Sequence, residues 1–256
     1  MRNRFPAEWE AQDGVLLGWP HKGTDWKDCL KEIEPVFIEI AKQIAQFEKL
    51  VIPCPNKKKV LGQLKKSGVN LDNVLCFEIK TNDTWARDYG FLTVYEENRP
   101  KMLNFGFNGW GLKFPSFDDN QINKNLYINK EFSQNSFQTV GLVLEGGSVE
   151  SDGRGLILTT SNCLLSPNRN PHLSQKKIEK KLKKWLYAKK ILWLDHGHLA
   201  GDDTDSHIDT LARLCPDHTI VYVSCEDKTD EHYQELQKMK DQLESFTDLE
   251  GNPFRL

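Results

Sequence analysis

Residues 201–213 read GDDTDSHIDTLAR and place four aspartates and one histidine among the eight residues from 202 to 209. Such a density rarely serves core packing, because an unpaired carboxylate is costly to bury. Carboxylates accept paired hydrogen bonds from a planar guanidinium, and an imidazole exchanges protons near neutral pH. The stretch therefore indicates a site that holds a cationic ligand between carboxylates, with a histidine beside it.

Two other stretches have the same character. Residues 81–90 read TNDTWARDYG, and residues 144–148 read LEGGS. Each of the three stretches follows a segment with the residue pattern of a β-strand, and loops at strand ends commonly carry function in α/β proteins. We therefore expect the three loops to contribute to one site.

Composition narrows the classes of protein to which the chain can belong. Its 256 residues are 38% hydrophobic, which is enough for a sizeable core, and the formal net charge of −3 provides no basic field for nucleic acid. No apolar run approaches the ~20 residues of a membrane span, and residues 1–6 lack the apolar core of a signal peptide. The six cysteines form no CxxC pairs, which is typical of reduced cysteines rather than of disulfides or a zinc site. We expect a cytoplasmic protein without membrane or nucleic-acid partners.

Helix and strand patterns alternate along the chain. Apolar residues at helical spacing predict a helix from Leu30 to Ile44, with Thr24 or Asp25 as its N-cap. Further helices are expected over residues 57–66, 174–186 and 231–246, and strands over 50–53, 74–79, 91–95, 102–107, 140–144, 155–160, 190–194 and 219–225. The alternation predicts an α/β fold without a clear domain boundary. By itself it fits a doubly wound sheet, a barrel or a propeller.

Asp88 and Asp209 are the first candidates for binding a guanidinium, because two facing carboxylates form a natural clamp for its planar fork of N–H donors. Each has a structural alternative. Asp88 could pair with Arg87 or with another arginine, and Asp209 could cap a helix or a turn.

His207 and Glu145 are the candidates for proton transfer and orientation. His207 lies within the acidic cluster and is expected to act as a general acid and base, although a lone histidine is more often structural. Glu145 precedes two glycines at the end of a predicted strand. It could orient His207 or contact substrate, and the alternative is an ordinary turn residue.

Three further residues could contact a substrate. Trp85 offers an aromatic face to a cation or an apolar stem, and Trp110 is a weaker candidate of the same kind. Core packing is the alternative for both. Asp203 could bind a second positive group, or it could be a solvated loop acid. The Asp/His loop could also hold a divalent cation in a metal-dependent hydrolase, but its spacing matches neither an EF-hand nor HExxH, so we expect no metal.

Several motifs in one order carry a resemblance to a known family. They are TNDTWARDYG, VLEGGSVESDG at 143–153, CLLSPNRNPHLS at 163–174 and GDDTDSHIDTLAR, together with PAEWE at 6–10 and LGWP at 17–20. The chain resembles, over essentially its whole length, the agmatine deiminase and bacterial-type peptidyl-arginine deiminase family. The resemblance implies a pentein fold, which is an α/β propeller of five ββαβ-type units around a central site. It also implies no metal or organic cofactor.

The resemblance implies a role for each candidate. Asp88 and Asp209 would bind the guanidinium nitrogens, His207 would be the general acid/base, and Glu145 would lie near both substrate and histidine. Trp85 would pack along the substrate. Asp203 stands where the family commonly has a glutamate near the distal end of the substrate. In such enzymes a cysteine thiolate attacks the guanidinium carbon, and agmatine gives ammonia and N-carbamoylputrescine, a precursor of putrescine in polyamine metabolism.

The family nucleophile follows a Gly-rich segment that ends in a His-Cys pair, and residues 251–256, GNPFRL, contain no such pair. We therefore expect a single deiminase domain over residues 1–256, with about four of five units and without the nucleophile, so that the chain as given is inactive. Cys163 is expected in the core. The alternatives to an agmatine deiminase are a peptidyl-arginine deiminase and a non-catalytic guanidine- or amine-binding remnant. A homodimer is expected.

Overall fold

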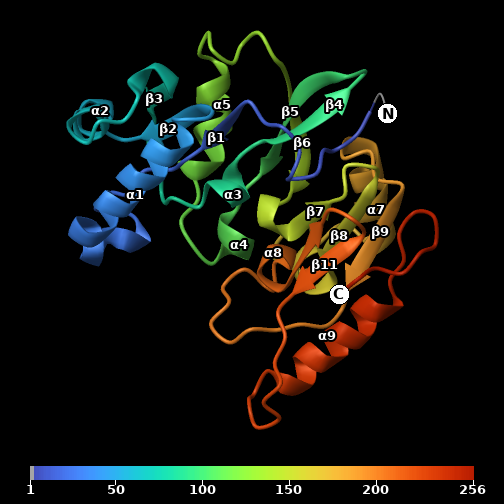
Figure 1. Ribbon diagram of the computed structural model, residues 1–256. Coiled ribbons are helices and arrows are strands. Elements are labelled where there is room, and N and C mark those ends of the chain that lie inside the picture. Colours follow the sequence, from blue (N-terminus) through green and yellow to red (C-terminus); the bar gives the residue numbers. More distant parts are fainter. Residues whose placement is uncertain (1–2) are drawn as a thin grey trace. The chain divides into compact units, whose positions relative to one another are not determined.

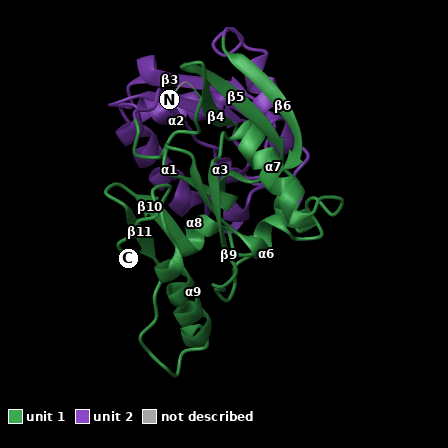
Figure 2. Ribbon diagram, turned by 90° about the vertical axis from the view of Figure 1, so that its right-hand side faces the viewer, with its two compact units in different colours: residues 1–10, 91–114, 135–256 green, residues 11–90, 115–134 purple. Residues whose placement is uncertain are grey.

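The computed structural model describes residues 3–256, which form four small sheets and the helices that accompany them (Figure 1). This confirms the predicted α/β class. The chain divides into two compact units (Figure 2). Unit 1 contains the N-terminal residues up to Glu10 with residues 91–114 and 135–256, and unit 2 contains residues 11–90 and 115–134. Among the described residues, no helix is both long enough and apolar enough to cross a membrane.

Unit 2 is built on a parallel sheet. Its three strands, in the order in which they pair, are β1 (Gly14–Leu16), β2 (Lys49–Cys54) and β3 (Val74–Glu78). Its helical segments are η1 (Asp25–Cys29), α1 (Leu30–Ile44), α2 (Lys57–Lys66), η2 (Leu71–Asn73), α3 (Ala86–Tyr89), η3 (Asp119–Gln121) and α5 (Ile122–Tyr127). Helices α1 and α2 connect neighbouring parallel strands, because such strands need a crossover rather than a tight turn. Their apolar faces pack with Trp19 and Ile52 in one core.

One local prediction in unit 2 is wrong. The N-cap of α1 is Cys29, not Thr24 or Asp25. A short 3₁₀ turn over Asp25–Cys29 precedes the α-helix, so Thr24 is the N-cap of that turn instead. The helix itself has the predicted bounds.

Unit 1 twice shows a hairpin followed by a crossover to a parallel strand, and a third hairpin is followed by a helix and a single parallel bridge. The hairpins are β4 (Leu92–Glu96) with β5 (Arg99–Gly106), β7 (Val149–Ser151) with β8 (Leu156–Thr160), and β10 (Ala212–Cys215) with β11 (Thr219–Tyr222). The parallel strands are β6 (Ser136–Val143) beside β5 and β9 (Lys190–Leu194) beside β8. After α9 (Tyr233–Ser245), Arg255 forms a parallel bridge with Thr219. This is the ββαβ order that the resemblance implies.

Strand β8 lies between two apolar clusters of unit 1, and all five of its residues are buried. Ile157 packs with α7 (Gln175–Trp185), whereas Leu156 and Leu158 pack with α9. The alternation follows from the strand geometry, in which successive side chains point to opposite faces. Thr160 at the end of this rigid strand begins the short helix α6 (Ser161–Leu164) and so leads the chain into the candidate site.

Candidate active site

Glu145 is positioned by the end of a strand, as predicted. It follows β6 and stands at the N-cap of the short turn η4 (Gly146–Ser148). Its side chain is fully buried, and the Ser148 hydroxyl donates to its backbone carbonyl at 2.6 Å. A buried carboxylate at this point needs a partner, because an isolated ion in a protein interior is strongly unfavourable.

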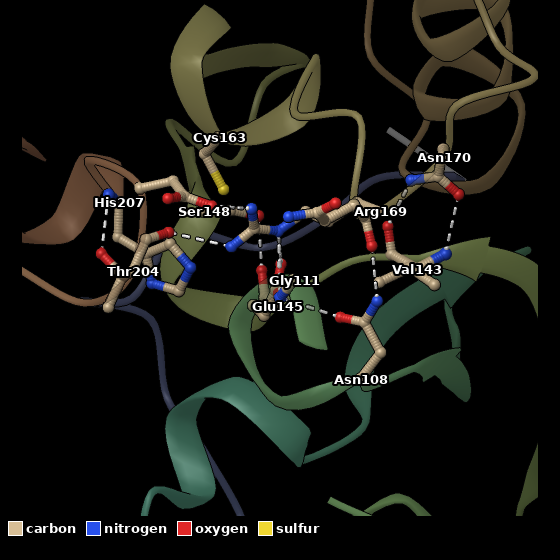
Figure 3. Close-up of polar contacts among 12 residues, drawn as sticks. Asn108, Gly111, Val143, Glu145, Ser148, Cys163, Arg169, Asn170, Thr204 and His207 are labelled. Atoms are coloured by element: carbon tan, nitrogen blue, oxygen red, sulfur yellow. Dashed lines mark hydrogen bonds and ion pairs between the residues drawn. The ribbon is translucent and has the colours of Figure 1, made fainter. Parts of the chain in front are cut away.

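Arg169 is that partner. Its Nε donates to both carboxylate oxygens of Glu145, at 3.0 Å and 2.9 Å, and neither side chain is exposed to solvent. The next residue, Asn170, pairs with both backbone groups of Val143 at the end of β6, donating to its carbonyl at 2.8 Å and accepting from its amide at 3.1 Å. Figure 3 shows these contacts side by side. The segment that carries Arg169 is therefore fastened to the strand that carries Glu145.

Burial and charge act in opposite directions on this pair. Burial raises the pKa of Glu145 above its ordinary value, and the charge and hydrogen bonds of Arg169 limit that rise. Burial would lower the pKa of Arg169, but the neighbouring Cys163, Glu145 and Asp205 groups outweigh it and raise the pKa. Arg169 therefore stays a cation in the buried part of the site.

The same guanidinium also binds the loop that leads to His207. Its Nη1 donates to Asp205 Oδ2 at 2.6 Å, and its Nη2 donates to the Thr204 carbonyl at 2.9 Å. Lys113 Nζ donates to the other oxygen of Asp205 at 2.6 Å. Burial opposes ionisation of Asp205, but the hydrogen bonds from Lys113 and Arg169 prevail and lower its pKa. Asp205 is therefore an ionised bridge between two cations.

His207 is buried directly after this loop and stands at the N-cap of α8 (Ile208–Leu211). Its backbone amide donates to Thr204 Oγ1 at 3.0 Å. A ring nitrogen of His207, a carboxylate oxygen of Glu145 and the Cys163 thiol lie within 4.8 Å of one another (Figure 3). The structure thus brings together Glu145 and His207, two of the residues that the sequence analysis selected.

Cys163 is buried in the core of unit 1, as expected, and has no solvent exposure. It also borders the Glu145 and His207 pair, which the sequence analysis did not foresee. One signal was available, because Cys163 and Arg169 belong to the same CLLSPNRNPHLS stretch. The sequence analysis used that stretch only as evidence for the family resemblance, and it assigned no functional role to any residue in it.

Glu145, Cys163 and His207 are of the residue types that bind transition metals. However, both oxygens of Glu145 already accept hydrogen bonds from Arg169, whose positive charge would repel a metal ion. Two acids of the Asp/His loop, which was considered above as a possible metal site, already have partners. Asp202 accepts from loop amides, and Asp205 binds Lys113 and Arg169. The geometry favours acid–base chemistry at these residues, and the absence of a metal stays a prediction.

The remaining candidates of unit 1 differ in exposure. Asp209 lies half-buried in α8, and Asp203 is exposed, with its backbone carbonyl bound by Lys113. Trp110 is buried, and its ring makes edge contacts with Phe107 and Phe114 at centroid distances of 5.0 Å and 5.6 Å. This is the packing role that was the alternative for Trp110, so its contact with substrate stays a prediction.

Asp88 and Trp85 lie in unit 2, on α3 and directly before it. Asp88 is 9% exposed, whereas Trp85 is 41% exposed. The Trp85 ring packs 6.1 Å from the Trp26 ring at a tilt of 33°, and its Nε1 donates to Asp25 Oδ2 at 3.3 Å. Unit 2 therefore presents an accessible indole beside carboxylates, which suits a cationic or apolar stem.

The loop before Trp85 is held by a buried carboxylate, Asp119. Its Oδ1 accepts from the amide of Asn82 at 2.7 Å, and its Oδ2 accepts from the amide of Asp83 at 3.1 Å. Burial raises the pKa of Asp119 from 3.8 to about 7 despite these bonds. The sequence analysis gave no role to Asp119, which lies 31 residues after Asp88, and no local pattern distinguishes it.

Asp119→Asn should stabilise the protein relative to wild type as the pH rises. The unfolded Asp119 ionises near 3.8 and the folded one near 7, so wild type loses stability across this interval. Asparagine does not titrate and can still accept from both amides. Relative to wild type, the unfolding free energy of Asp119→Asn should increase by about 2 kcal/mol between pH 5 and pH 8. Urea denaturation at the two pH values measures it, and the exposed Asp72→Asn should show no such change. A pH-independent difference for Asp119→Asn would contradict the prediction.

Comparison with known proteins identifies the family to which the chain belongs. A family model described as Porphyromonas-type peptidyl-arginine deiminase matches residues 4–256. The agmatine deiminase of Pseudomonas aeruginosa strain LESB58 is 34% identical and aligns with 97% of this chain and 67% of its own length. The agmatine deiminase of Medicago truncatula is 33% identical, with coverages of 98% and 69%.

Solved structures of similar proteins share the fold. A Cys-to-Ser variant of the C. jejuni agmatine deiminase with substrate bound has a TM-score of 0.89 and 40% identity, over 99% of this chain and 72% of that one. The agmatine deiminase of Enterococcus faecalis has a TM-score of 0.87 and 30% identity, over 99% and 69%. The predicted fold class is thereby confirmed.

Proposed function

Because this chain belongs to the Porphyromonas-type peptidyl-arginine deiminase family, we propose that it is a hydrolase of the agmatine deiminase type, which converts agmatine and water to N-carbamoylputrescine and ammonia. The observation that carries the proposal is the buried group of Glu145 and His207, fixed by Arg169, in loops that match the family motifs. Its substrate is a small molecule with a guanidinium group.

The side chains divide the chemistry between recognition and proton transfer. Asp88 and Asp209 supply carboxylates for the guanidinium nitrogens, because ionised acceptors bind its donors strongly, and Glu145 lies near both the substrate and His207. In the family reaction a thiolate adds to the guanidinium carbon, and His207 would then give a proton to the departing ammonia. The neutral imidazole then takes a proton from water, which adds to the same carbon as the carbon–sulfur bond breaks. The sequence analysis assigns this thiolate to no cysteine within residues 1–256, so these residues supply the carboxylates and the imidazole of the reaction. Trp85 and Asp203 would contact the remainder of the substrate.

Agmatine labelled with ¹³C at its guanidino carbon tests this function, because NMR distinguishes free agmatine, bound agmatine and the ureido product. The proposal predicts a bound signal from residues 1–256, whereas the ureido signal and equimolar ammonia require the thiolate that the sequence analysis does not find in them. His207→Gln should retain the bound signal and lose any ureido signal, since the imidazole moves protons rather than binding the ground state. His198→Gln, an exposed histidine, is the matched control and should change neither. A wild-type chain that neither binds nor converts agmatine would refute the proposal.

A second candidate is a guanidine-binding protein that lacks turnover. It is favoured by one observation: the cysteine beside Glu145 and His207, Cys163, has no solvent exposure and belongs to the core. Thermal stabilisation by agmatine without release of ammonia would favour this candidate over the hydrolase.

Peptidyl-arginine is the alternative substrate within the same family. Competition between agmatine and a peptide that contains arginine would separate the two, and the proposal predicts that agmatine binds more tightly. The homodimer, the cytoplasmic location and the single deiminase domain stay predictions. In the described part of the chain the six cysteines form no disulfide, which fits a reducing compartment, and light scattering would test the dimer.

A further inference from the structure

We propose that Arg169 is a positioning residue, which joins Glu145 to the loop that carries His207 and so fixes the two in the arrangement that receives substrate. The inference rests on the proposed function of the same site. Arg169 is not a catalytic residue in this proposal, because it acts through the groups that it binds.

The first argument is the number of separate segments that one guanidinium joins. Arg169 Nε binds Glu145 at the end of β6, its Nη1 binds Asp205, and its Nη2 binds the Thr204 carbonyl. The Arg169 side chain has no solvent exposure. A planar fork of five donors can meet these acceptors together, whereas the point charge of a lysine cannot. Among residues 3–256, no strand pairing includes Glu145 or residues 202–207, so the sheets do not provide this link.

The second argument is the conformation of the loop. Asp205 and Ser206 have φ values of +64° and +62°, in the left-handed region that non-glycine residues seldom adopt. Such residues persist where surrounding contacts hold them, and they cluster at functional sites. Here Arg169 and Lys113 bind the Asp205 carboxylate. Ser206 is held by Asp202, which accepts from its amide at 2.6 Å, and by Thr160, whose hydroxyl donates to its carbonyl at 2.7 Å. His207 follows Ser206 directly, so its placement depends on this strained segment.

The third argument is the close packing over the guanidinium. Gly111 has a φ of +78°, and a methyl group at its position would lie 3.4 Å from Arg169 Nη1 and 3.5 Å from Asp205 Oδ2. Its amide donates to Asn108 Oδ1, and the Asn108 amide group donates to the Asn168 carbonyl (Figure 3). The backbone at Gly111 therefore lies directly beside the Arg169 to Asp205 bridge, and its positive φ favours glycine at this position.

The fourth argument is electrostatic. Burial raises the pKa of Glu145, and Arg169 opposes the rise. The other groups that face this pair are the Asp205 carboxylate, the Cys163 thiol and the His207 ring, and Lys113 reaches Asp205 from the far side. Without Arg169, a buried Glu145 would take up a proton at a higher pH and would lose its negative charge toward a cationic substrate.

The test compares Arg169→Gln, Arg169→Lys and the exposed control Arg154→Gln with wild type. Carbon-13 NMR on glutamate-labelled protein measures the pKa of Glu145, with Glu145→Gln to assign the signal. Calorimetry measures agmatine affinity between pH 5 and pH 9. Arg169→Gln should raise the Glu145 pKa by about 1–3 units and move the acid limb of agmatine affinity upward with it. Arg169→Lys retains the positive charge, so it should show smaller shifts of both quantities than Arg169→Gln does. Arg154→Gln should resemble wild type.

If Arg169 had only a structural role, Arg169→Gln would reduce the stability of the protein. It would change neither the pKa of Glu145 nor the pH dependence of agmatine affinity. A folded Arg169→Gln protein whose Glu145 titration and affinity limb match wild type would overturn the inference. If Arg169→Gln does not fold, Arg169→Lys decides alone, and profiles identical to wild type would overturn the inference. Wild type that does not bind agmatine would refute the proposed function instead, while the Glu145 titration still decides the role of Arg169.

Discussion

Asp88→Asn should weaken the binding of agmatine by about 2–5 kcal/mol, which corresponds to a factor of about 30 or more in Kd. The substitution removes one negative charge from a carboxylate that is 9% exposed, with little change in volume. It also replaces one oxygen acceptor by an N–H donor, which faces the donors of a guanidinium. Isothermal titration calorimetry at neutral pH measures the loss.

Asp72→Asn is the matched control for Asp88→Asn, because Asp72 is an exposed aspartate of the same unit. It should leave the Kd within about twofold, as expected for a screened surface charge. A Kd for Asp88→Asn within threefold of wild type would remove Asp88 from the guanidinium clamp and would favour its structural alternative.

Arg169→Met should destabilise the protein by about 3–5 kcal/mol at pH 7.5, because it leaves the fully buried Glu145 carboxylate without its charge partner. Arg169→Met combined with Glu145→Leu should recover much of the loss, since the fully buried carboxylate is then removed together with its partner. Urea denaturation of the two variants, with the exposed Arg154→Met as control, measures the difference.

The loss in Arg169→Met should be smaller at pH 4.5 than at pH 7.5. The folded pKa of Glu145 lies above its ordinary value of 4.5, and removal of Arg169 raises it further. A carboxyl with a raised folded pKa loses stability as the pH rises from its unfolded to its folded pKa. A destabilisation below about 1 kcal/mol at pH 7.5, or one that does not depend on pH, would contradict the account of this pair.

Local periodicity predicted much of the fold. The helix expected over residues 57–66 is α2, with the same bounds, and the helical stripe from Leu30 to Ile44 is α1. Short strands were missed, because three or four residues carry too little pattern. Gly14–Leu16, Val149–Ser151 and Ala212–Cys215 are strands only because each finds a partner elsewhere in the chain. Pairing of this kind is a tertiary effect that the local sequence does not encode.

The sequence analysis selected site residues in loops that follow strands. It missed the partners of those residues, which lie far away in the sequence. Glu145 and His207 were selected and lie together. Arg169 was missed, although a buried glutamate requires a cation. Asp205 entered the sequence analysis only as part of the Asp/His loop, and its partners prove to be Lys113 and Arg169. These partners are 92 and 36 residues from Asp205, a separation at which single-sequence patterns identify no contact.

The measurement that tests the central claim most directly is the affinity of the wild-type chain for agmatine and for putrescine, by calorimetry under one set of conditions. Putrescine carries an ammonium where agmatine carries the guanidinium. A site built from carboxylates for a planar guanidinium should bind agmatine at least about tenfold more tightly, and Asp88→Asn should abolish this preference. Equal affinity for the two ligands, or a preference that survives Asp88→Asn, would contradict recognition of a guanidinium and with it the deiminase account.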